Sequence, residues 1–118
     1  MTLPRDYVDY VRDMLEAAQK AEQFTQGVDA ESFAANEEKT FAVIRALEII
    51  GEAARKIPDT VRLQYPAIQW REVIGMRSKL VHDYFGVDVR RGWETVKTDL
   101  PALRTALTRI LDGLDRAE

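Results

Sequence analysis

The sequence predicts an all-α protein, folded as an antiparallel bundle of four to five helices. Three observations lead to this fold class. Apolar residues recur at steps of three and four along almost the whole chain, which is the period of an amphipathic helix. No segment alternates apolar and polar residues for long enough to form a strand. The connections between the amphipathic segments are short, as they are in helical bundles. We therefore expect one domain, covering residues 1–118.

The first half of the chain predicts two long helices. One runs from about residue 4 to 25, where Pro4 suits the first turn and Gly27 the end. Its inward face is expected to consist of Tyr7, Val11, Met14, Ala18 and Ala21. The second begins after Asn36, a good N-cap, and stops at Pro58. Its inward face is expected to consist of Val43, Leu47, Ile50, Ala54 and Ile57.

The second half predicts a short helical turn within 59–65, a third helix at about 68–82 and a long fourth helix capped by Asp88. Apolar residues keep heptad spacing along that fourth helix: Trp93, Val96, Leu100, Leu103, Leu107, Ile110 and Leu114. Pro101 lies inside this pattern and lacks a backbone N–H, so we expect a kink near 99–100.

Composition limits the cellular setting and the kinds of site. The chain has no cysteine, which excludes a disulfide scaffold and a thiolate metal site and favours a reducing compartment. The N-terminus lacks the apolar core of a signal peptide, and no apolar run approaches the roughly 18 residues that span a bilayer. We therefore expect a cytoplasmic protein that does not engage membranes.

Charge is distributed unevenly along the chain. The net charge is −3, which by itself argues against nucleic-acid binding. Residues 1–61 carry 7 basic and 12 acidic side chains, whereas residues 62–91 carry 6 basic and 3 acidic ones. A phosphate contact, if the protein makes one, is expected in the 62–91 segment. A solvated charge run is the alternative reading.

The segment GMRSKLVHDYFGVD, residues 75–88, interrupts the apolar pattern. On the third helix the inward positions are expected to be Trp70, Ile74, Arg77 and Val81. A guanidinium at such a position needs a partner. Arg77 is therefore expected either to pair with an acid such as Glu48 or Glu52, or to face a cleft where an anion binds.

The only histidine, His82, shares a helix face with Ser78, four residues earlier, and Arg77 is close enough in sequence to share a site with it. Tyr84 follows near the helix end, before Gly86. Taken by themselves, these residues also fit structural roles: a histidine at a helix terminus, an arginine in an ion pair and a core or interface aromatic.

The pattern R-x4-H-x-Y, formed by Arg77, His82 and Tyr84, resembles the signature of HepT-like proteins of the HEPN superfamily. The similarity extends to residues 44–58 and to residues 93–101. It covers most of the chain, in the order found in that family.

This resemblance implies a homodimer in which the motifs of both subunits share a cleft. It also implies a toxin of the HEPN–nucleotidyltransferase type, an endoribonuclease that needs no metal or cofactor. Arg77 and His82 would be catalytic, with Ser78, Lys79 and Arg71 supporting RNA phosphates. The partner would be a minimal nucleotidyltransferase antitoxin that transfers AMP to Tyr84.

The residue types suit this chemistry. Histidine moves protons near neutral pH, and a guanidinium stabilises charge on a pentavalent phosphorus. Ser78 stands where HEPN nucleases commonly have a larger polar residue such as asparagine. The alternative function is a non-catalytic helical subunit that binds nucleotide or substrate beside a nucleotidyltransferase, and a plain interaction module is a third.

Overall fold

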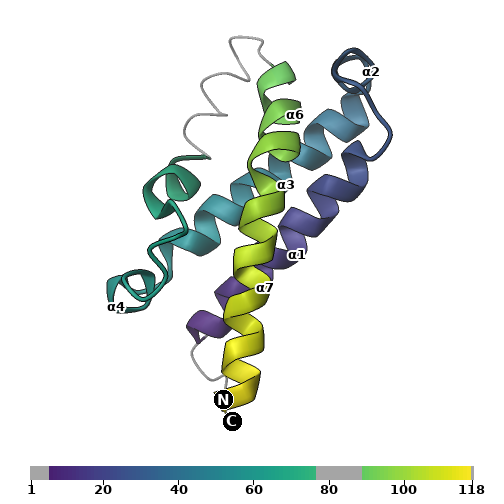
Figure 1. Cartoon of the computed structure of the whole chain (residues 1–118). Coiled ribbons are helices and arrows are strands. Elements are labelled where there is room, and N and C mark those ends of the chain that lie inside the picture. Colours follow the sequence, from purple (N-terminus) through teal and green to yellow (C-terminus); the bar gives the residue numbers. More distant parts are fainter. Residues whose placement is uncertain (1–5, 77–88, 118) are drawn as a thin grey trace, which may run out of the picture.

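Every regular element in the computed structural model, which describes residues 6–76 and 89–117, is a helix (Figure 1). In chain order these are α1 (Tyr7–Thr25), α2 (Ala30–Ala35), α3 (Glu37–Arg55), α4 (Asp59–Arg62), α6 (Val89–Thr98) and α7 (Leu100–Ala117). Residues 70–76 are also helical. None of the helices in these ranges is long and apolar enough to cross a membrane. The all-helical fold expected from the sequence is confirmed.

The core forms where α1 packs against α3 and α7. Figure 1 shows α6 and α7 passing across the pair formed by α1 and α3. The expected inward positions of α1 after its first turn are buried, as are all five expected for the helix that ends at Pro58. These residues are Val11, Met14, Ala18, Ala21, Val43, Leu47, Ile50, Ala54 and Ile57. Tyr7 is partly buried against the same core. Apolar spacing alone therefore identified the faces that form the centre of the bundle.

The C-terminal end of α1 is held by lysines from two other helices. Lys39 Nζ of α3 donates to the carbonyl oxygen of Phe24 at 3.2 Å, and Lys97 Nζ of α6 donates to that of Thr25 at 2.8 Å. The last carbonyl groups of a helix have no partners within it and carry partial negative charge, so ammonium groups stabilise them. Gly27 then takes a positive φ of 70°, which turns the chain toward α2.

The short helix α2 was not predicted from the sequence. Asp29 caps its N-terminus, where the carboxylate accepts a hydrogen bond from the Ser32 N–H at 2.7 Å. Asn36 then caps α3 as expected, accepting from the Lys39 N–H at 3.0 Å. Phe33 of α2 is fully buried, so this helix closes one end of the core.

The long C-terminal helix is divided where Pro101 predicted a kink. Helix α6 ends at Thr98 and α7 begins at Leu100. Because Pro101 has no N–H, it cannot donate to the carbonyl four residues earlier. Five of the seven heptad positions are buried in spite of this break: Val96, Leu100, Leu103, Leu107 and Ile110. Trp93 and Leu114 are partly buried against them.

Candidate functional site

The motif residues Arg77, Ser78, Lys79, His82 and Tyr84 lie outside the described residues. What the structure describes is the chain on either side of them. The helical stretch 70–76 leads into the motif segment, and α6 follows it. We call these two elements the stems of the site.

The first stem is anchored by one tryptophan and two buried apolar side chains. Trp70 Nε1 donates to the carbonyl oxygen of Tyr65 at 3.1 Å. Val73 and Met76 are buried in the core, whereas Trp70 and Ile74 are only partly buried. The prediction that Trp70 and Ile74 face inward is confirmed in part, because both pack against the core but are buried less deeply than Val73 and Met76. Val73 is also buried because this stretch has large apolar side chains on more than one side.

The second stem is tied to the turn between α1 and α2. Trp93 Nε1 donates to the carbonyl oxygen of Val28 at 2.8 Å, and Lys97 holds the end of α1 as described above. Lys97 Nζ also lies 6.0 Å from the centre of the Trp93 ring. These contacts fix the position of α6 against a part of the molecule distant in sequence.

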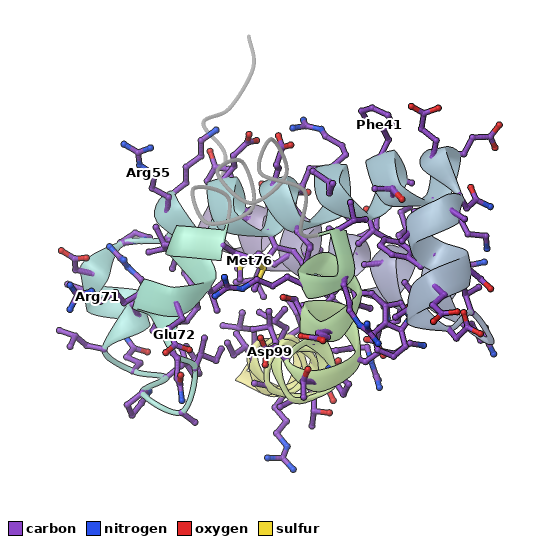
Figure 2. The ribbon with its side chains drawn as sticks, turned by 90° about the horizontal axis from the view of Figure 1, so that it is seen from above. Phe41, Arg55, Arg71, Glu72, Met76 and Asp99 are labelled. Atoms are coloured by element: carbon purple, nitrogen blue, oxygen red, sulfur yellow. The ribbon has the colours of Figure 1, made fainter. Side chains whose placement is uncertain are left out.

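A cleft of about 480 Å³ separates the stretch 67–76 from α6 and α7. Its apolar wall includes Ile68, Val73, Met76, Leu103 and Ala106. Figure 2 shows Glu72, Met76 and Asp99 on the two sides that face each other across it. The cleft therefore lies between the two stems of the site.

Among the described residues that line the cleft, three charged side chains are acidic and one is basic. Glu72 contributes from one wall and Glu94 and Asp99 from the other, with Arg91 as a cation. Arg90 lies 3.9 Å from Glu94. Within residues 6–76 and 89–117, no group of three or more histidine, cysteine, aspartate or glutamate side chains is arranged to hold a metal ion.

The two acids suggested as partners of Arg77 lie on α3 next to a different arginine. Arg45 Nη1 is 3.4 Å from Glu48 Oε2 and 3.6 Å from Glu52 Oε1. Glu48 and Glu52 are partly buried, while Arg45 is exposed. The pairing of either acid with Arg77 stays a prediction, because Arg77 is outside the described residues.

Arg71, predicted to support RNA phosphates, is exposed in the first turn of the first stem. Figure 2 shows it at the same end of the molecule as Arg55, the last residue of α3. Figure 1 likewise places the end of α3 and the stretch 70–76 at the α4 end of the molecule. The segmental charge count missed Arg55 and Lys56 because they belong to the acidic first half of the chain. The one local indication of this basic surface in the sequence was the pair Arg55 and Lys56 at the end of a predicted helix.

The comparisons with known proteins agree with the motif. A family model described as "Ribonuclease HepT-like" matches residues 14–110. A Thermococcus cleftensis protein named "Probable ribonuclease HepT" is 49% identical over 102 residues, covering 86% of this chain and 93% of its own length. A Methanocaldococcus jannaschii protein with a provisional RNase name is 41% identical over 111 residues, covering 94% and 96%. A similarly named protein of Caldanaerobacter subterraneus is 36% identical over 111 residues, covering 94% and 96%. No solved structure matches the chain significantly.

Proposed function

The chain belongs to the HepT-like ribonuclease family, and from that premise we propose that it is an endoribonuclease that cleaves RNA without a metal ion, using Arg77 and His82. The family match carries the proposal. It covers residues 14–110 and so includes the whole R-x4-H-x-Y motif. Residues 1–118 are proposed to form one such domain, acting in the cytoplasm.

Cleavage without a metal uses the ribose as the nucleophile. His82 takes the proton from the 2′-OH, whose oxygen attacks the adjacent phosphorus. The bond from phosphorus to the 5′-oxygen of the next nucleotide breaks, which leaves a 2′,3′-cyclic phosphate, and the protonated His82 returns its proton to that leaving oxygen. Arg77 offers paired N–H donors to the oxygens of the pentavalent phosphorus, where negative charge grows in the transition state. Ser78, Lys79 and Arg71 are proposed to support the phosphates of the bound strand. The need for a 2′-OH restricts the reaction to RNA.

A homodimer is the proposed working form. A polar pair such as Arg77 and His82 in a segment with many apolar residues is easier to accommodate in a cleft shared by two subunits than in a monomer core. Light scattering at micromolar concentration should give twice the monomer mass of 13.5 kDa. A monomer would contradict this form.

A minimal nucleotidyltransferase is the proposed partner, and the pair is proposed to work as a toxin and its antitoxin. AMP attached to Tyr84 would place a phosphate anion and a bulky nucleoside two residues from His82. Both the charge and the bulk would oppose entry of an RNA strand.

The activity is tested with the purified protein, RNA and excess EDTA. The parent protein should cleave RNA with EDTA present, and His82→Ala should lose a factor of about 10²–10⁴ in rate, which is typical for a proton-transfer group. The melting temperature of His82→Ala is expected to stay near that of the parent. Lys20→Ala is a control, since this exposed lysine lies on α1 and pairs with Glu16 at 2.9 Å. Cleavage that stops with EDTA, or that persists in His82→Ala, would show this mechanism to be wrong.

A further inference from the structure

The first stem lies between a cleft, whose described charged residues are mostly acidic, and a basic surface. On one side lies the cleft with Glu72, Glu94 and Asp99. At the α4 end of the molecule lie Arg71 and Arg55, both exposed and both projecting outward in Figure 2. Lys56, which follows Arg55, is also exposed. We call Arg55, Lys56 and Arg71 the basic edge.

The basic edge is not neutralised by the acids of its own segment. Three acids lie near these cations in the chain, but each is engaged elsewhere. Asp59 pairs with Arg62, Glu52 Oε1 lies 3.6 Å from Arg45 Nη1, and Glu72 lines the cleft. Lys56 Nζ lies 5.5 Å from the centre of the Tyr10 ring on α1, an interaction with an aromatic face that leaves its charge intact. Among the described residues, no ion pair therefore involves Arg55, Lys56 or Arg71.

Helix electrostatics explain one of these cations but not another. Arg55 is in the last turn of α3, where a positive charge stabilises the helix dipole. Arg71 is in the first turn of the stretch 70–76, where a positive charge opposes the dipole. Its position has a small electrostatic cost within the fold, which a phosphate contact would offset.

Distance along the helix links the edge to the motif. Arg71 is five residues before Met76, and at about 1.5 Å per residue this is about 7.5 Å along the helix. Because residue 77 follows Met76 directly in the chain, an RNA strand bound at the motif passes close to Arg71.

We propose that the basic edge binds the phosphate backbone of the RNA strand that flanks the cleaved position, and that Arg55 and Lys56 extend the RNA site beyond the motif. This inference rests on the proposed ribonuclease function. Surface cations bind a single strand mainly by releasing its counter-ions, and each phosphate contact contributes about 0.7 to the slope of log affinity against log salt. At 0.1 M salt, loss of one contact therefore lowers the affinity about fivefold.

The test measures binding apart from cleavage. The probe is a 2′-O-methyl oligouridine of about 12 nucleotides, a length within reach of one small domain, which cannot be cut because its 2′-oxygens are blocked. Affinity is measured for the parent, Arg55→Gln, Arg55→Gln/Arg71→Gln and Arg109→Gln over a range of salt concentrations. Arg109 is the matched control, because it is an exposed arginine on α7, one turn past the cleft residue Ala106.

Arg55→Gln should bind about fivefold more weakly at 0.1 M salt, with a slope smaller by about 0.7, and the double variant about 25-fold more weakly. Arg109→Gln should bind like the parent, and all variants should keep the parent melting temperature. Equal affinities of Arg55→Gln and the parent, or equal losses in Arg55→Gln and Arg109→Gln, would overturn the inference. Failure of the parent to bind the probe at low salt would also overturn it. If the parent binds the probe but does not cleave ordinary RNA, the proposed nuclease function is wrong. The slopes of log affinity against log salt then still show whether the basic edge binds the strand.

Discussion

Trp93 Nε1 donates a 2.8 Å hydrogen bond to the carbonyl oxygen of Val28, across 65 residues of sequence. The bond joins α6 to the turn between α1 and α2. Helix α6 is the stem that follows the motif segment. The contact therefore fixes one stem of the candidate site against the turn between α1 and α2.

Trp93→Phe should therefore destabilise the protein. The substitution keeps an aromatic ring but removes the indole N–H, so the Val28 carbonyl loses its donor. A loss of about 0.5–1.5 kcal/mol in the free energy of unfolding is expected, as for one ordinary hydrogen bond. Urea unfolding measures it. The control is Phe41→Tyr, because Phe41 lies on the exposed face of α3. Phe24→Tyr would not serve as a control, since Phe24 lies beside the same turn as Val28. Trp93→Phe with parental stability would mean that the bond contributes nothing.

Leu107→Ala should be among the more damaging substitutions on α7. Leu107 is fully buried in the core, so truncation removes apolar contacts and leaves a cavity. The expected cost is about 2–5 kcal/mol. Arg109→Ala, two residues along the same helix and exposed, should have little effect. Chemical denaturation of both variants checks the difference, and similar values for the two would contradict the assigned core face.

Asp29 should make stability depend on pH in the acid range. The backbone N–H of Ser32 donates to its carboxylate and lowers the pKa of Asp29 below its ordinary value. The unfolded chain then binds the proton more tightly than the folded one, so the contribution is complete above pH of about 4 and is lost as the pH falls through the folded pKa.

Asp29→Asn isolates this contribution, because asparagine caps a helix about as well as aspartate but does not titrate. The melting temperature of the parent should fall more steeply than that of Asp29→Asn as the pH drops below about 4. Parallel curves for the two proteins would show that the carboxylate is not stabilised by the fold.

Tyr84 is predicted to carry AMP after co-expression with a neighbouring nucleotidyltransferase. Mass spectrometry should find one or more AMP units on the peptide that contains Tyr84. Tyr84→Phe should remain toxic despite the partner, because the phenol oxygen that accepts the AMP is absent. An unmodified Tyr84, or neutralisation of Tyr84→Phe by a catalytically inactive partner, would indicate inhibition by binding alone.

Local rules were sufficient for the long helices. Residues three and four apart lie on one face of a helix, so the buried positions from Val43 to Ile57 could be read from their spacing. The break before Leu100 was equally local, since it follows from the missing N–H of Pro101. Helix α2 was missed because six residues are too few to display a period, and Phe33 is buried by packing rather than by pattern.

The motif also came from the sequence alone: Arg77, His82 and Tyr84 were identified by their spacing and family resemblance, and the family match confirms the family but not their roles. Only the tertiary structure decided that Val73 and Met76 are buried more deeply than Trp70 and Ile74 in the first stem. It also decided that Arg55 of α3 lies at the same end of the molecule as Arg71 (Figure 2). Helical periodicity follows from bonds between near neighbours, whereas side-chain burial and the field of a charged surface depend on distances between segments that the chain order does not specify.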